Sequence, residues 1–163
     1  MDIFEMFGKR RSVRQYTGDP VPREDLLKIV AAGHTAATGY NKQPWDFIVV
    51  QDRAMIQEMA DRTSAWLAQA GAIIVVVLDP STRFWMEDGS AAIENMHLAA
   101  TALGYGSCWF EGTMLPHEEY FKQRLAIPPD RRILTFLPIG VPADWPEGPK
   151  KKPLEEVLHW EKW

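Results

Sequence analysis

The pattern of hydrophobic positions predicts four strands. Residues 72–78 form the most apolar run, which is rich in β-branched residues and has no polar alternation. This pattern is typical of a central strand that is buried on both faces. Further strands are expected at residues 45–50, 106–111 and 132–139.

Capping residues and apolar periodicity predict the helices. Short helices are expected at residues 2–9 and 116–126, and a longer one from Pro22 to just before Gly33. Asp52 can cap a further helix that has Met55, Ile56 and Met59 on one side. The longest helix should begin at Asp88 or Ser90 and end at Gly104. Leu26, Leu27 and Val30 would form the apolar face of the second helix. The connections are too uneven for a series of βαβ units. We therefore expect an α+β fold with a mostly antiparallel central sheet surrounded by helices, as a single domain over residues 1–163.

Composition narrows the class of protein. The 163 residues include 46% hydrophobic and 25% charged residues, a balance typical of globular domains. The net charge of −4 lacks the basic surplus of most nucleic-acid binders, so no nucleic-acid partner is expected. The N-terminus carries acid where a signal peptide carries base, and the longest apolar run is too short to span a membrane. These features favour a cytoplasmic protein with no membrane partner.

The end of the chain is unusually aromatic. Residues 142–152 are rich in Pro and Lys and should be irregular, whereas residues 154–163 are expected to form a short strand or helix. Trp145, Trp160 and Trp163 are difficult for a small monomer to cover. They indicate a partner surface.

Common catalytic signatures of phosphate loops, zinc sites and redox dithiols are absent from the sequence. The four histidines, at positions 34, 97, 117 and 159, have no spacing that suggests a metal site. The one cysteine, Cys108, cannot form an intramolecular disulfide and is expected to be a buried, inert thiol. Any catalysis is therefore expected to depend on a cofactor.

Three segments carry residues suited to a flat, phosphorylated ligand. In residues 10–14 (Arg-Arg-Ser-Val-Arg), guanidinium groups and a hydroxyl can bind phosphate, although taken alone a solvated basic turn is the better interpretation. In residues 38–45, Asn and Gln can bind both edges of a heterocycle, and the alternative is a capped turn. In residues 104–112, glycines permit close approach of a ligand to the backbone, and the alternative is a strand between two glycine turns.

Together, in this order, the segments resemble the nitroreductase family of FMN enzymes. The similarity rests on "RRSVRQY" followed by Pro20-Val21, on "NKQPWDFIVV", on "AAIENMHLAATALGYGSCWFEG" and on "KKPLEEVLHW". The chain differs from many members in having Ala37-Thr38 for Pro-Ser and a Lys, Lys151, for the tail Arg. It is also short for the family, which leaves the substrate open.

The resemblance implies an FMN site. Arg10, Arg11 and Ser12 would hold the phosphate and ribityl region, with Lys151 reaching it from the tail. Arg14 would face the N1/O2 edge of the flavin. The other implied contacts are Thr38, Gly39 and Asn41 from the second subunit of a homodimer, and the backbone of Phe110, Glu111 and Gly112 near flavin N5.

The implied activity is transfer of hydride from NADH or NADPH, through flavin N5, to an electron-poor acceptor such as a nitroaromatic or a quinone. The two substrates would stack in turn on the same face in a ping-pong mechanism, with no catalytic side chain required. Two alternatives stay open: reductive dehalogenation or flavin modification on the same fold, and a non-catalytic FMN-binding or regulatory protein.

Overall fold

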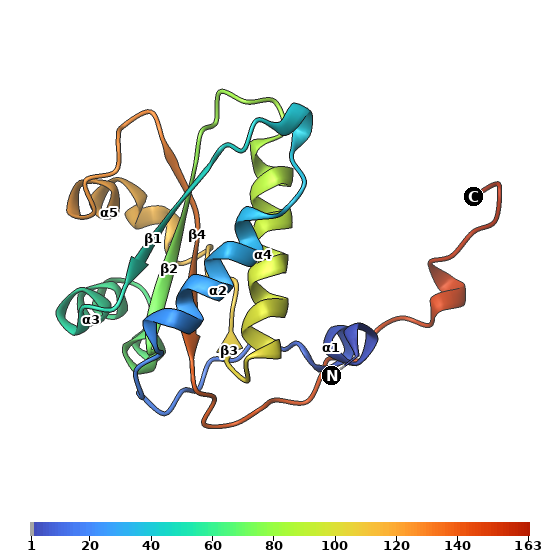
Figure 1. Cartoon of the computed structure of the whole chain (residues 1–163), viewed down its shortest axis with the longest axis horizontal. Helices are drawn as coiled ribbons and strands as arrows, with labels where there is room; N and C mark the ends of the chain where they lie inside the picture. Colours follow the sequence, from blue (N-terminus) through green and yellow to red (C-terminus); the bar gives the residue numbers. More distant parts are fainter. Residues whose placement is uncertain (1) are drawn as a thin grey trace.

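The computed structural model describes residues 2–163 and contains a four-stranded antiparallel sheet with helices on both faces (Figure 1). The strand order is β1-β2-β4-β3. The strands are β1 (Trp45–Val50), β2 (Ala72–Leu78), β3 (Gly106–Ser107) and β4 (Arg132–Gly140). The expected α+β architecture is confirmed.

Five α-helices and four short 3-10 turns connect the strands in the described residues. The helices are α1 (Ile3–Lys9), α2 (Arg23–His34), α3 (Arg53–Arg62), α4 (Trp85–Ala102) and α5 (Glu118–Arg124). The 3-10 turns are η1 (Gly39–Asn41), η2 (Ala65–Gln69), η3 (Leu115–His117) and η4 (Leu154–Glu156). Asp52 caps α3 as expected, because its carboxylate accepts from the Met55 N–H at 2.8 Å.

Strand β2 lies at the centre of the sheet and separates two hydrophobic cores. Its odd-numbered side chains pack with α3, η2 and α5, and its even-numbered side chains pack with α2 and α4. All seven of its residues are buried. Because successive side chains point to opposite faces, burial on both faces removes the polar alternation, and the predicted central strand is confirmed.

Helices α2 and α4 lie side by side on one face of the sheet (Figure 1). Gly33 was expected after the end of α2, but it lies inside the helix. A Cβ atom there would lie 2.8 Å from Met96 of α4, so the glycine serves the close approach of two helices. The expected apolar face is also partly wrong, since Leu27 is 61% exposed and Ile29 is buried instead.

Helix α4 begins at Trp85, earlier than the expected start at Asp88 or Ser90. The Asp88 carboxylate does not cap its own helix, because it accepts from the Gly39 N–H at 2.9 Å.

Strand β3 is also shorter than predicted. After Ser107 the chain leaves β4 and returns to it only at Phe110, which forms an isolated bridge with Phe136.

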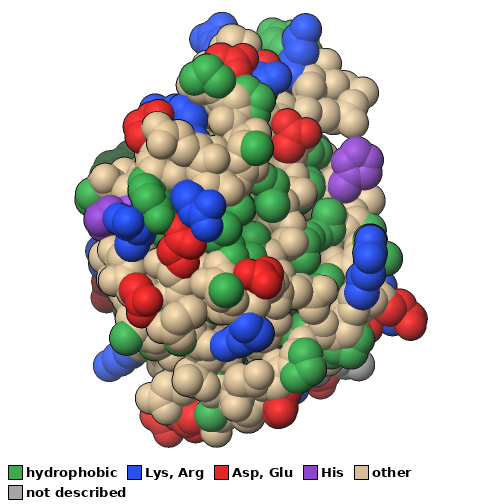
Figure 2. All heavy atoms as spheres, turned by 90° about the vertical axis from the view of Figure 1, so that its left-hand side faces the viewer, with side chains coloured by type: hydrophobic (Ala, Val, Ile, Leu, Met, Phe, Trp, Pro, Cys, Tyr) green, Lys and Arg blue, Asp and Glu red, His purple; other side chains and the backbone are tan. Residues whose placement is uncertain are grey.

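The opposite face of the sheet is covered by α3 and α5. Figure 2 shows acidic and basic side chains interspersed with hydrophobic ones on this side of the molecule. The bidentate ion pair of Glu58 with Arg124 links the two helices.

Within residues 2–163, no helix is both long and apolar enough to cross a membrane.

Candidate functional site

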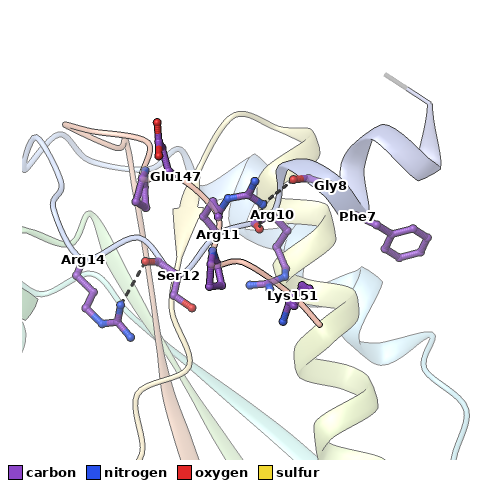
Figure 3. Close-up of a pocket in the computed structure, with 11 residues that line it drawn as sticks. Phe7, Gly8, Arg10, Arg11, Ser12, Arg14, Glu147 and Lys151 are labelled. Carbon is purple, nitrogen blue, oxygen red and sulfur yellow. Dashed lines mark hydrogen bonds between the residues drawn. The ribbon is translucent and has the colours of Figure 1, made fainter. Parts of the chain in front are cut away.

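A cavity of about 700 Å³ lies between the end of α1, residues 10–14 and the C-terminal tail (Figure 3). It is lined by Phe7, Gly8, Arg10, Arg11, Ser12, Arg14, Pro146, Glu147, Gly148, Pro149 and Lys151. The five residues that the family resemblance assigns to the phosphate and the flavin edge, including Lys151 from the distant tail, therefore line one cavity.

The basic segment is held in place by its backbone. Ser12 pairs with Ser107 of β3 in a parallel bridge, and the Val13 N–H donates to the Ser107 carbonyl at 2.9 Å. Val13 is fully buried, while Ser12 and Arg14 on either side of it are exposed. The glycine at position 106 permits this approach, because a Cβ there would lie 2.7 Å from Val13. An extended backbone with a buried anchor thus projects the polar side chains into the cavity.

The C-terminal tail closes the cavity by lying against the N-terminal segment. The Ala143 N–H donates to the Gln15 carbonyl at 2.9 Å, and the Trp145 indole donates to the Lys9 carbonyl at 2.9 Å. The first of the three noted tryptophans thus packs within its own chain. Trp160 and Trp163 are 77% and 102% exposed.

The cations of the cavity divide into three positions. In the view of Figure 3, Arg10 and Lys151 are on one side of Ser12 and Arg14 is on the other, and all of them line the cavity. Arg11 is turned back onto the chain, where its Nη1 donates to the carbonyls of Gly8 at 2.5 Å and Arg10 at 2.8 Å. Its Nε is buried without a hydrogen-bond partner. Arg10, in turn, forms a 3.4 Å ion pair with Glu94 of α4.

The cationic cluster influences three buried groups beneath it. Burial, reinforced by the nearby Arg10 charge, lowers the pKa of His97 to about 4. Burial raises the pKa of the Cys108 thiol, against the opposing charges of Arg14 and Arg10. Burial likewise raises the pKa of Tyr16. The predicted inert character of Cys108 agrees with its burial and its raised pKa.

The second predicted segment lies elsewhere in the chain. Figure 1 shows η1, with Gly39 and Asn41, at the N-terminal end of α4, whereas α1 lies near the other end. An 18-residue helix is about 27 Å long, so Thr38, Gly39 and Asn41 do not reach the cavity of their own chain.

The third predicted segment leaves only part of its backbone available for a ligand. The Phe110 N–H already donates to the Phe136 carbonyl and to Thr135 Oγ1, both at 3.0 Å. In the described part of the chain, the N–H groups of Glu111 and Gly112 form no hydrogen bond. The Glu111 carboxylate accepts from the Trp109 indole at 2.8 Å.

Sequence reasoning missed two polar anchors inside the fold. His97 and Ser107 form a buried hydrogen bond beneath the basic segment. Asp88, expected only as a helix start, holds Gly39. For the His97–Ser107 pair, the one indication in the sequence is a histidine within the Ala-rich stretch of α4. No pattern in the sequence indicates which group this histidine contacts.

Comparison with known proteins agrees with this architecture. The model of the Nitroreductase family matches residues 8–77 and 55–141. A protein of Archaeoglobus fulgidus named "Putative NADH dehydrogenase/NAD(P)H nitroreductase" is 37% identical over 153 residues, covering 88% of this chain and 87% of that protein. A crystal structure of a protein of the same name from Parabacteroides distasonis has a TM-score of 0.90 and 31% identity, covering 99% of this chain and 98% of that one.

A further solved structure concerns the ligand. The crystal structure of a "putative nitroreductase in complex with fmn" from Desulfovibrio desulfuricans has a TM-score of 0.87 and 29% identity, covering 100% of this chain and 98% of that one. The antiparallel sheet with helices on both faces, and the basic cavity beside it, thus have the form of a nitroreductase-type α+β protein. The chain belongs to the nitroreductase family.

Proposed function

We propose that residues 1–163 form a single FMN-binding domain of a flavin oxidoreductase, which passes hydride from NADH or NADPH to an electron-poor acceptor by a ping-pong mechanism. The observation that carries the proposal is the convergence of Arg10, Ser12, Arg14 and Lys151 on one cavity from opposite ends of the chain. The flavin, when bound, supplies the hydride-accepting and hydride-donating chemistry.

The residues present fit FMN in charge and size. The cavity, at about 700 Å³, is within the range of small-ligand sites. Arg10, Arg14 and Lys151 supply positive charge and hydrogen-bond donors, and Ser12 supplies a hydroxyl. The buried Arg11 Nε, which lacks a partner, is a further donor at the same place. This donor set matches a phosphate with a ribityl chain.

The positions of the cations suggest separate roles. Arg10 and Lys151, which line the same cavity, would bind the phosphate. Arg14, on the other side of Ser12, would face the N1/O2 edge of the ring, where its fixed charge stabilises negative charge and favours the reduced cofactor. Arg11 would mainly hold the turn between α1 and the basic segment, since its Nη1 is engaged by two carbonyls.

The backbone near residues 110–112 would contribute two donors. The Phe110 N–H is engaged within the sheet, so the N–H groups of Glu111 and Gly112 are the ones suited to face the flavin near N5. A Cβ atom at Gly112 would have no neighbour within 4 Å, which is the open space that a flat ring requires.

The site would be completed in a homodimer, with Thr38, Gly39 and Asn41 entering from the second subunit. Their distance from the cavity of their own chain supports this arrangement. Two apolar surfaces support it further. The first is on α1, where Phe4 is 77% exposed. The second is the tail after residue 153, which extends away from the body (Figure 1) and has Leu154 and Trp160 exposed. Burial of these side chains against a partner would stabilise the dimer.

Flavin content and turnover test the proposal. Purified protein should carry, or bind, about one FMN per chain, measured from the absorbance of the heat-released supernatant. It should oxidise NADH or NADPH when a quinone or nitroaromatic is supplied, with parallel lines in double-reciprocal plots. Lack of flavin, with no binding of added FMN at micromolar concentration, would refute the cofactor assignment. Bound FMN without turnover of any acceptor would favour the non-catalytic alternative, and turnover only with halogenated substrates would favour dehalogenation.

A further inference from the structure

We propose that a hollow at the N-terminal end of α4 binds the adenosine diphosphate half of the nicotinamide donor. The hollow has a volume of about 300 Å³ and lies between η1 and the segment that leads into α4. The inference rests on the proposed function, because it concerns the donor of that reaction. Tyr40, Lys42, Ser81, Thr82, Arg83 and Phe84 carry the argument.

Two cations line the hollow, Lys42 and Arg83, and the Arg83 guanidinium carbon lies 5.2 Å from the centroid of the Phe84 ring. In the described residues, neither Lys42 nor Arg83 forms an ion pair, and both are exposed. Ser81 and Thr82 also line the hollow, and the Thr82 hydroxyl donates to the Asp79 carbonyl at 3.3 Å. Positive charge and hydroxyl groups at one hollow are the chemistry that binds phosphates.

The hollow also has an aromatic wall. The rings of Tyr40 and Phe84 are stacked, with centroids 6.4 Å apart and an angle of 29° between their planes. Tyr40 is nevertheless 84% exposed, so much of its ring is uncovered. An uncovered aromatic ring beside phosphate-binding cations is suited to stack with a purine base.

The exposed position of Tyr40 is imposed by the fold. Its φ of +54° lies in the left-handed region, which is unfavourable for a bulky residue, and Asn41 at +55° shares this conformation. The Asp88 carboxylate fixes the loop through the Gly39 N–H, and a Cβ at Gly39 would lie 2.5 Å from the Phe84 ring. Backbone strain of this kind persists where the surrounding structure holds it, and it is enriched at ligand sites.

The charge balance of the hollow favours an anion. Asp88 also lines it; this side chain is 5% exposed, its Oδ1 accepts from the Gly39 N–H, and its Oδ2 is buried without a hydrogen-bond partner. Asp88 also lies in the first turn of α4, where the helix dipole offsets negative charge. Two exposed cations and one buried carboxylate leave a positive formal charge on the lining, which favours an anionic ligand.

The position of the hollow connects it to the proposed site. It is continuous with the loop that carries Asn41, the residue proposed to enter the FMN site of the second subunit. A dinucleotide whose nicotinamide stacks on that flavin would extend across the interface toward Tyr40 and Lys42. The hollow would thus bind the part of the donor that does not react, which lowers KM without changing the chemical step.

The test compares donors with and without the adenosine diphosphate. The variant is Lys42→Gln/Arg83→Gln, and the matched control is Arg23→Gln/Lys28→Gln, which removes two exposed charges from α2. The donors are NADH, NADPH and N-benzyl-dihydronicotinamide, which has no phosphate. The variant should raise KM for both dinucleotides at least roughly tenfold, the effect of one lost charge-assisted hydrogen bond, with KM for the benzyl compound and the FMN content unchanged. The control should leave all three KM values unchanged.

An equal rise of KM for all three donors, or no rise for the dinucleotides, would overturn the proposal. Direct binding of ADP, measured by calorimetry on wild type and on the double variant, provides a readout that does not depend on turnover. If the wild type lacks flavin or does not oxidise NAD(P)H, the proposed function fails. ADP binding that is abolished by the double substitution would still establish the nucleotide site, and the absence of ADP binding to wild type would refute it.

Discussion

The imidazole Nδ1 of His97 lies 2.6 Å from the hydroxyl oxygen of Ser107, inside the core between α4 and β3. The Ser107 carbonyl accepts from the Val13 N–H, so this buried pair lies directly beneath the basic segment. His97 is 3% exposed, and burial together with the Arg10 charge lowers its pKa to about 4. At neutral pH the ring is uncharged, which makes the anchor compatible with the cations above it.

The lowered pKa of His97 predicts a loss of stability on mild acidification. Above about pH 6.5 the ring is neutral in both the folded and the unfolded chain, so it adds no pH dependence. As the pH falls from 6.5 toward 4, the unfolded chain takes up a proton that the folded chain does not, and unfolding is favoured by up to about 3 kcal/mol.

His97→Gln should reduce this acid sensitivity, because an amide can still bind Ser107 but does not titrate in this range. The free energy of unfolding in urea, measured from pH 4 to pH 8 for both proteins, checks the prediction. The two curves should converge at the acid end. Parallel curves would show that His97 does not control the pH dependence.

Arg10 and Arg14 are predicted to act differently on the cofactor. Arg10→Ala should weaken FMN binding by about 1.5–3 kcal/mol, the value of one charge-assisted hydrogen bond. Arg14→Gln should lower the flavin reduction potential and slow turnover more than it weakens binding, since it removes positive charge facing the ring edge. Fluorescence titration and a redox titration with a reference dye measure the two effects. An unchanged potential in Arg14→Gln would contradict the assignment.

Gly148 is predicted to control closure of the cavity by the tail. A Cβ atom there would lie 2.6 Å from Arg11 Nη2, and the guanidinium is held in place by the Gly8 and Arg10 carbonyls. Gly148→Ala should therefore displace the tail and weaken FMN binding by about 1 kcal/mol. Gln123→Ala is the control, because Gln123 is exposed on α5 and does not line the cavity. Equal FMN affinity in the two variants would exclude this role for the tail.

The shared site predicts complementation between two impaired variants. Arg10→Ala and Asn41→Ala homodimers should each be impaired at both sites. In a mixed dimer one site carries both lesions and the other carries neither, so one site per heterodimer should bind FMN with wild-type affinity. Purified heterodimers, obtained with two different affinity tags, permit the measurement. If no site in them binds FMN better than the parents do, the two residues do not come from different subunits.

The sequence by itself determined the central strand, the Asp52 cap and the basic segment. Each of these depends on neighbouring residues along the chain: a continuous apolar run, a carboxylate next to a helix start, and a cluster of guanidinium groups. The order of four short segments also identified the family, which the family model confirms. Local chemistry is readable in such cases because it does not depend on what lies across the fold.

Only the tertiary structure decided how distant groups are paired. It placed Lys151 in the same cavity as Arg10, turned Arg11 onto the Gly8 carbonyl and engaged the Phe110 N–H within the sheet. In the structure Gly33 lies at the contact between α2 and α4, and α4 begins at Trp85 instead of at Asp88. Contacts of this kind join residues far apart in the chain, and their geometry depends on packing of the whole core, which no local pattern encodes.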